Sequence, residues 1–156
     1  MPKLLSAGSI FFFMLAHVKA MAMPEPLYLF SEVTGVVTID GKPVAGAEVQ
    51  QIYIWKSDEV INRTLTDEEG RYSFPEVTKT SFIWSWLPHE PFISQRVNIL
   101  QAGETHKGWF YSKHDYDKNG ELKGRPINLR CDLINPTKAH PETEYFGLCT
   151  LDFRKK

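Results

Sequence analysis

Apolar and polar residues alternate with a period of two along most of the chain from Glu32 onward. This alternation is typical of β-strands that place one face on a core, and helical spacing is rare in this chain. The clearest predicted strands lie within residues 32–39, 47–55, 93–100 and 127–133. About seven to eight short strands, separated by Gly and Pro turns, indicate an all-β fold of two stacked antiparallel sheets.

The predicted turns carry glycine where a left-handed backbone is needed. Asp40-Gly41 predicts a tight turn after the first of these strands, and residues 66–70 (TDEEG) predict a short hairpin loop that ends on Gly70. Between residues 47 and 55 the alternation changes phase across Gln50 and Gln51. A β-bulge at that point would account for the change, and we predict one there.

Residues 1–22 have the pattern of a signal peptide. Lys3 precedes a nearly continuous apolar stretch from Leu4 to Val18, and small residues follow at positions that fit a cleavage site. The apolar stretch is shorter than the roughly 20 residues that a membrane-spanning helix needs, so a single-pass anchor is the weaker alternative. We therefore expect export without a stable membrane anchor, and a single domain over residues 23–156.

The two cysteines, Cys131 and Cys149, both fall in the predicted mature domain. Cys131 shares the apolar face of its predicted strand, and Cys149 repeats that phase in the last segment, so the two sulfurs could meet. In an oxidising compartment we expect them to form a disulfide that ties down the C-terminal segment. The alternative is a metal or redox site, but neither CxxC spacing nor nearby histidines support it.

The charge balance bears on the class of partner. The whole chain has a formal charge of −1, and loss of Lys3 and Lys19 with residues 1–22 leaves 16 basic against 19 acidic residues, a formal charge of −3. Nucleic acid is an unfavourable partner for such a surface, because phosphate binding requires basic residues.

Two segments resemble a known family. Residues 35–49 (GVVTIDGKPVAGAEV) and 66–75 (TDEEGRYSFP) resemble the carboxypeptidase regulatory-like domain of the transthyretin-like superfamily. The resemblance implies a Greek-key β-sandwich, a fold that carries many unrelated functions. Residues 87–91 and 119–124 are similar to a family of small exported bacterial proteins that have this domain alone, which implies the periplasm, with secretion as the alternative. By analogy, small exported domains of this kind often serve as immunity proteins against toxins that act on the cell envelope.

Catalytic motifs of related folds do not match. The transthyretin-like hydrolase of 5-hydroxyisourate ends in Tyr-Arg-Gly-Ser, whereas the last six residues here are LDFRKK. Zinc carboxypeptidase chemistry requires a His-x-x-Glu pair, and His140 is followed three positions later by Thr143. We therefore predict that the protein is not an enzyme and needs no cofactor.

One segment resembles half of a calcium-binding loop. Asp115, Asp117 and Asn119 place oxygen ligands at alternate positions before Gly120, as in the first half of such a loop. The second half lacks ligands, because Pro126 stands at the twelfth position. This segment is a weak candidate for a cation site, and a solvated hairpin loop is the alternative. His106 and His114 lie nearby and are interpreted as surface histidines.

Aromatic residues give the strongest hint of a binding surface. In the predicted strand 81–87, Trp84 and Trp86 share one face with Phe82, and this face either belongs to the core or is partly exposed. The proline-rich loop that follows carries His89 and Glu90 at its tip, and loops of this kind often bind partners.

Single tryptophans more often complete a core, but Trp55 and Trp109 are further candidates for the binding surface. Our expected partner contacts are Trp84, Trp86, His89, Glu90 and Trp109. We expect a non-catalytic protein that binds another protein, most concretely an immunity-type protein that blocks a secreted toxin sterically. The alternative is an envelope accessory or structural module that binds carbohydrate or another cell-surface component.

Overall fold

The computed structural model describes residues 24–81, 83 and 89–153. The predicted signal peptide, Trp84 and Trp86 therefore lie outside the described residues. The strands are β1 (Leu27–Phe30), β2 (Val33–Ile39), β3 (Lys42–Pro43), β4 (Glu48–Trp55), β5 (Asp58–Leu65), β6 (Arg71–Phe74), β7 (Val77–Lys79), β8 (Ile93–Gln101), β9 (Glu104–Lys113), β10 (Ile127–Asp132), β11 (Lys138–His140), β12 (Tyr145–Gly147) and β13 (Thr150–Leu151). A single turn of 3-10 helix, η1 (Gly120–Leu122), lies between β9 and β10.

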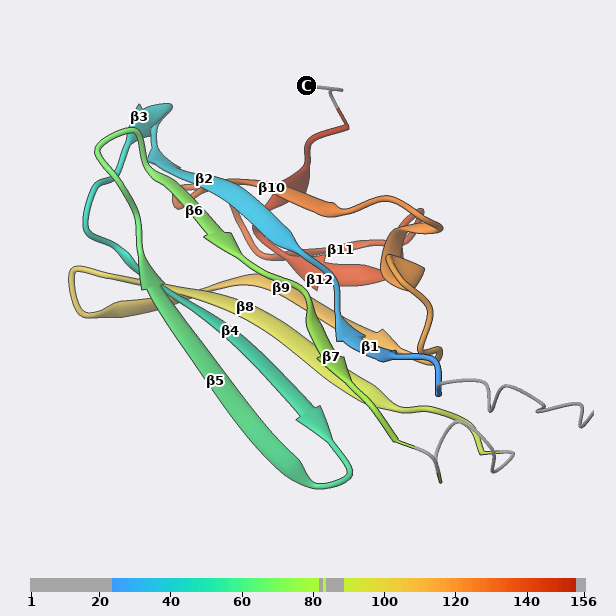
Figure 1. Cartoon of the computed structure of the whole chain (residues 1–156). Helices are drawn as coiled ribbons and strands as arrows, with labels where there is room; N and C mark the ends of the chain where they lie inside the picture. Colours follow the sequence, from blue (N-terminus) through green and yellow to red (C-terminus); the bar gives the residue numbers. More distant parts are fainter. Residues whose placement is uncertain (1–23, 82, 84–88, 154–156) are drawn as a thin grey trace, which may run out of the picture.

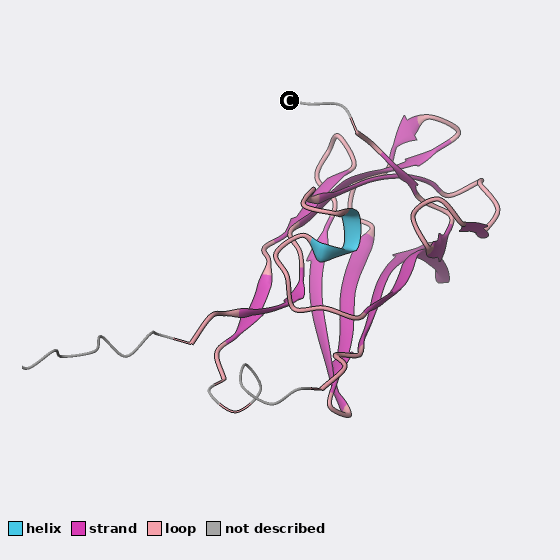
Figure 2. Cartoon of the chain, turned by 90° about the vertical axis from the view of Figure 1, so that its right-hand side faces the viewer, coloured by secondary structure: helices cyan, strands magenta, loops and turns pink. Residues whose placement is uncertain are grey.

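The strands form a two-layer sandwich, which confirms the predicted all-β fold (Figures 1 and 2). The larger sheet has the order β11-β12-β9-β8-β4-β5. The opposing sheet has the order β13-β10-β2-β3, with β6 also paired to β2, and β1 pairs with β7. The chain passes repeatedly from one layer to the other, so segments far apart in the sequence meet inside the sandwich.

One strand pair departs from the predicted antiparallel arrangement. Strands β2 and β10 run parallel, from Val33 opposite Ile127 to Thr38 opposite Asp132. A parallel pair requires a long crossover connection, and β3 to β9 together with the loop around η1 supply it. The Ile127 N–H donates to Glu32 O (3.2 Å), so β10 enters the sheet at the end where β2 begins.

The period-two alternation places apolar side chains between the layers. From the smaller sheet, Val33 and Val37 of β2 are fully buried, and from the larger sheet Val97 and Ile99 of β8 are fully buried. Trp109 of β9 is 1% exposed and stacks on Tyr145 with ring centroids 4.3 Å apart. The interpretation of Trp109 as a partner contact is therefore wrong, because its ring completes the core.

The predicted disulfide between Cys131 and Cys149 is present. Cys131 lies on β10, and Cys149 lies between β12 and β13. The bond therefore joins the smaller sheet to the segment that leaves the larger one. In the chain-entropy model, closing a loop of this length stabilises a fold by about 3 kcal/mol.

Two turn predictions are confirmed, and one irregularity was predicted in the wrong strand. Gly41 and Gly70 both have φ of +72°, as the predicted turns require. The register of β4 with β5 and β8 is continuous, and the irregularity lies instead between Val97 and Asn98 of β8 opposite β9. Gln51 is fully buried and accepts a hydrogen bond from Asn62 Nδ2 (2.9 Å), so a buried amide produced the apparent change of phase.

The segment between β9 and β10 closes one end of the sandwich, and its only helical element is the single turn η1 (Figure 2). Among the described residues, no helix has the length and apolar character needed to cross a bilayer.

Candidate functional site

A small pocket lies at the end of the sandwich where the β4–β5 hairpin turns. It has a volume of about 290 Å³ and is called the aromatic pocket below. Three segments form it, namely the hairpin turn, the segment that leads into β8, and the loop after β9. Its lining residues are Ile54, Trp55, Lys56, Ser57, His89, Glu90, Phe92 and Tyr116.

Tyr116 joins the three segments at the centre of the aromatic pocket. The Trp55 Nε1–H donates to Tyr116 Oη (3.0 Å), and His89 Nε2 lies 2.9 Å from the same oxygen. Because Oη already accepts from the indole, the phenolic hydrogen is directed to His89 Nε2 when that nitrogen is unprotonated. The indole and phenol rings meet edge to face, with centroids 6.4 Å apart.

The pocket is lined by both charged and aromatic side chains. Lys56 Nζ lies 3.9 Å from the centroid of the Trp55 ring, so one face of the indole is covered by an ammonium group. Desolvation lowers the pKa of Lys56, and the Asp58 carboxylate acts in the opposite direction. Phe92 is 59% exposed and contacts the His114 ring, and His114 Nδ1 lies 4.0 Å from Glu90 Oε1.

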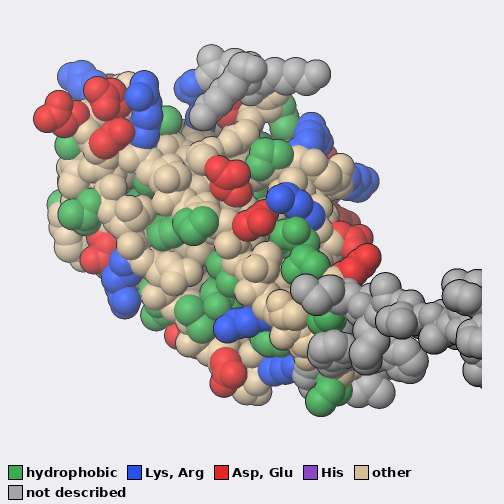
Figure 3. Space-filling model, viewed as in Figure 1, with side chains coloured by type: hydrophobic (Ala, Val, Ile, Leu, Met, Phe, Trp, Pro, Cys, Tyr) green, Lys and Arg blue, Asp and Glu red, His purple; other side chains and the backbone are tan. Residues whose placement is uncertain are grey.

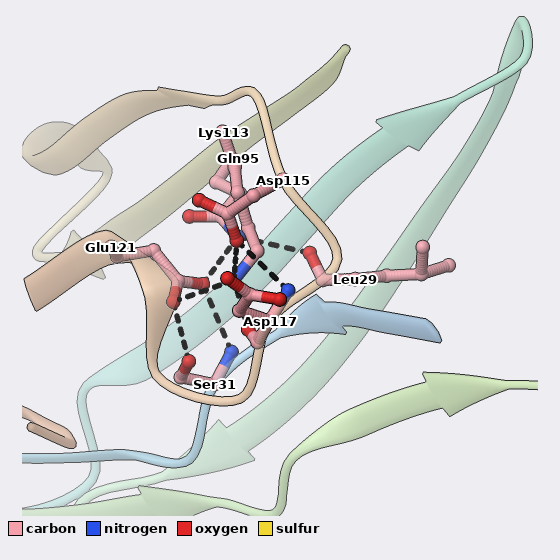
Figure 4. Close-up of polar contacts among 7 residues, drawn as sticks. All are labelled: Leu29, Ser31, Gln95, Lys113, Asp115, Asp117 and Glu121. Atoms are coloured by element: carbon pink, nitrogen blue, oxygen red, sulfur yellow. Dashed lines mark hydrogen bonds and ion pairs between the residues drawn. The ribbon is translucent and has the colours of Figure 1, made fainter. Parts of the chain in front are cut away.

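A buried ionic cluster holds the loop that carries Tyr116 (Figure 4). Lys113, the last residue of β9, has a side chain with 0% exposure. Its Nζ donates to Asp117 O (2.7 Å) and contacts Glu121 Oε2 (3.1 Å) and Asp115 Oδ1 (3.2 Å). An ammonium group has three donors, and here each of them meets an oxygen of the loop or of η1. The loop thus folds around a cation that belongs to the protein itself.

The Glu121 carboxylate anchors this cluster to the interior. It accepts hydrogen bonds from Ser31 N (3.1 Å), Ser31 Oγ and Gln95 Nε2 (2.7 Å), so β8 and the residue after β1 both contribute. Burial by itself favours the neutral acid. The Lys113 ammonium and the hydrogen bonds from Ser31 and Gln95 outweigh this effect and hold the pKa of Glu121 below its ordinary value of 4.5.

The same contacts account for the segment that resembles a calcium loop. Asp115 Oδ1 accepts from Asp117 N (2.9 Å) and contacts Lys113, and a Cβ at Gly120 would lie 2.0 Å from that carboxylate oxygen. Asn119 adopts the left-handed conformation (φ 55°) that lets the loop turn. Within the described ranges no group of three or more His, Cys, Asp or Glu side chains could hold a metal ion. The loop joins β9 of the larger sheet to β10 of the smaller sheet, so it is not a hairpin loop, and its Asp115 carboxylate and the Glu121 carboxylate both contact Lys113.

The structure brings together only part of the predicted binding surface. His89 and Glu90 both line the aromatic pocket, where Trp55 joins them. Trp109 is in the core, and nothing is described for Trp84 and Trp86. Tyr116 and Phe92 were missed by sequence reasoning. Tyr116 could have been found, because it is an aromatic residue inside a polar loop.

Residues 33–136 match a family profile with the description "Domain of unknown function (DUF6795)". The matched range includes every residue that lines the aromatic pocket, as well as Lys113 and Glu121. No curated protein and no solved structure matches the chain.

Proposed function

Because the chain belongs to the family described as Domain of unknown function (DUF6795), whose description names no activity, we propose a function from the geometry of the aromatic pocket. We propose that the protein binds another protein at this pocket and acts by steric occlusion, without catalysing a reaction.

The construction of the pocket is the observation that carries this proposal. Polar atoms of the pocket are hydrogen-bonded to one another, because Tyr116 Oη contacts both the Trp55 indole nitrogen and His89 Nε2. A nucleophile or general base needs a polar atom directed at a substrate, whereas these atoms fix the orientation of the rings. Rigid aromatic groups beside an exposed Phe92 are typical of interface hot spots, where a few anchors carry most of the binding energy.

The size of the pocket supports a protein partner. A volume of about 290 Å³ lies at the lower end of the range for small-molecule sites, which bury most of a ligand of drug size. Such a pocket suits one inserted side chain, surrounded by the mixed charges of Lys56 and Glu90. The polar rim would then exclude water around the anchor, as it does in many protein interfaces.

We place this function in the bacterial periplasm, as an immunity-type protein that covers the active site of an envelope-directed toxin. Support comes from the sequence of residues 1–22, from the resemblance of residues 87–91 and 119–124 to small exported bacterial proteins, and from a disulfide that persists in oxidising compartments. A formal charge of −3 for residues 23–156 favours a basic partner.

Under this proposal an exported toxin is encoded beside this protein, and co-expression with that toxin tests the function. We expect the wild-type protein to protect the cells and to co-purify with the toxin, whereas Phe92→Ala removes an anchor and lowers the affinity at least tenfold. Ile134→Ala is the matched control, since Ile134 is about as exposed (62%) and does not line the pocket. Protection that is equal in the Phe92→Ala variant and in the wild type, or no protection by either, would refute the proposal.

Carbohydrate binding is the competing function, and the geometry favours it less. Sugar rings stack on open aromatic faces, but the ammonium group of Lys56 covers one face of Trp55. Titration of tryptophan fluorescence with a glycan panel separates the two functions. A saturable response that Trp55→Phe abolishes would support the carbohydrate function and oppose ours.

A further inference from the structure

The longest open edge of the sandwich is β5, the outermost strand of the larger sheet (Figure 1). In the part of the chain that the structure describes, β5 pairs with β4 alone. It has eight residues, whereas the other edge strands among the described residues have two to four. Natural proteins keep exposed edges short, because unpaired backbone N–H and C=O groups are a template for another strand.

The outer face of β5 carries charges of both signs. Glu59, Ile61 and Arg63 lie on this face, where they are opposite Ile54, Ile52 and Gln50 of β4. Glu59 and Arg63 are exposed, and Ile61 between them is half-buried. Arg63 Nε lies 3.4 Å from Glu48 Oε1, and the guanidinium carries further donors for a second carboxylate. Space-filling representation of the molecule shows acidic, basic and hydrophobic side chains interspersed on the face in view (Figure 3).

Two copies of β5 are complementary in one antiparallel register. With Ile61 opposite Ile61 of the second copy, Glu59 lies opposite Arg63, and Arg63 lies opposite Glu59. The remaining pairs are Asp58 with Thr64 and Val60 with Asn62, and none of them opposes like charges. Opposite charges in directly paired positions stabilise a sheet.

Neighbouring registers lose this complementarity. A pairing centred on Val60 places Glu59 opposite Ile61, and a pairing centred on Asn62 places Arg63 opposite Ile61. A pairing centred between two residues would place side chains from opposite faces of the strand directly across from each other, which the pleat does not allow. Among these pairings, only the one centred on Ile61 satisfies both charges.

We infer that β5 is a dimerisation edge, at which two copies of this chain join their larger sheets across a two-fold axis at Ile61. An isologous interface of this kind requires a self-complementary surface, and the Glu59–Arg63 spacing supplies it. Because the strands run antiparallel, the two aromatic pockets lie toward opposite ends of the joined sheet. The inference concerns a different surface from the pocket and does not depend on the proposed function.

Charge reversal tests the dimer. Sedimentation velocity of the purified protein over micromolar to submillimolar concentrations should show a dimer. Glu59→Arg and Arg63→Glu each oppose like charges at two positions, so each should raise the dissociation constant by about tenfold or more. An equimolar mixture of the two variants should form a heterodimer of wild-type affinity, because both charge pairs are then restored. Lys107→Glu, an exposed reversal on β9, should leave the dimer unchanged.

A thiol at the two-fold axis gives a second and independent readout. The two native cysteines are joined to each other, so an added thiol has no competing partner. Ile61→Cys should give a disulfide-linked dimer under mild oxidation, whereas Leu65→Cys, which is exposed but far from the axis, should not. A protein that stays monomeric throughout, a dimer insensitive to both reversals, or a mixture that does not restore association would overturn the inference.

Discussion

The side chain of Lys113 is fully buried, yet its ammonium group contacts oxygens of three neighbouring residues. Of the proposed ligand residues Asp115, Asp117 and Asn119, only the Asp115 carboxylate and the main-chain oxygen of Asp117 contact this ammonium group. The sequence did not show that Lys113 is buried here, because its partner Glu121 is held by Ser31 and Gln95, which are 90 and 26 positions away and meet it only in the folded sandwich. At the scale of single residues, ligand-like spacing predicts charge but not the identity of the charged group.

Substitution of Lys113 should destabilise the protein strongly. Lys113→Met leaves the Glu121 carboxylate buried without its counter-charge, and we expect a loss of about 3–5 kcal/mol in the free energy of unfolding, measured with urea. The double variant Lys113→Met/Glu121→Met should recover much of this loss, because it leaves no unpaired charge. Lys118→Met, which removes an exposed pair with Glu76, should have little effect. A small effect of Lys113→Met would show that the cluster is not buried in solution.

The lowered pKa of Glu121 predicts loss of stability in acid. The pKa of Glu121 is lower in the folded state than in the unfolded chain, so its contribution is complete above pH 4.5 and is lost as the pH falls through the folded value. Urea unfolding between pH 7 and pH 3 should show this decline. In Glu121→Gln the decline should be shallower but not absent. A decline remains in this variant because Asp132 also has a lowered pKa. Desolvation raises the pKa of Asp132, but hydrogen bonds from the Gly41 and Ile134 N–H groups outweigh that effect. If the free energy of unfolding fell equally steeply with decreasing pH in the wild type and in Glu121→Gln, the lowered pKa of Glu121 would be contradicted.

Among the elements, those with uninterrupted alternation were predictable and those that depend on distant partners were not. Strands β2 and β8, and the turns at Gly41 and Gly70, match the sequence prediction because local pattern and turn chemistry agree there. The parallel pairing of β10 with β2 was not predictable, since alternation is the same in parallel and antiparallel strands. The bulge predicted in β4 was wrong because Gln51, whose amide oxygen accepts a hydrogen bond from Asn62, occupies a buried position that the pattern expects to be apolar.

Two glycines with the same backbone angle should respond differently to substitution. Gly41 and Gly70 both have φ of +72°, so Gly41→Ala and Gly70→Ala each incur the left-handed penalty of about 1–2 kcal/mol. A Cβ at Gly70 would also lie 2.3 Å from Val37 O, whereas a Cβ at Gly41 would have no atom within 4 Å apart from those of Gly41 and its two chain neighbours. Thermal and urea unfolding should therefore show a larger loss for Gly70→Ala, by about 1–3 kcal/mol. Equal losses would mean that the backbone of β2 yields freely.

At the scale of the whole molecule, the sandwich brings three distant segments to one end and fixes them there. The hairpin supplies Trp55, the segment before β8 supplies His89 and Phe92, and the loop that Lys113 holds supplies Tyr116. The sequence predicted an aromatic binding surface and placed His89 and Glu90 on it. It did not predict Tyr116, because only the buried ionic cluster shows how that loop returns to the hairpin.

Site-specific photo-cross-linking in living cells tests most directly whether the aromatic pocket is the partner-binding surface. A photoreactive p-benzoylphenylalanine at Phe92 should give a discrete covalent adduct with a second protein species. The same group at Ile134, which has similar exposure but lies outside the pocket, should not. Adducts of the same partner at both positions, or at Ile134 alone, would contradict the assignment of the pocket as the binding surface, as would the absence of any adduct at Phe92.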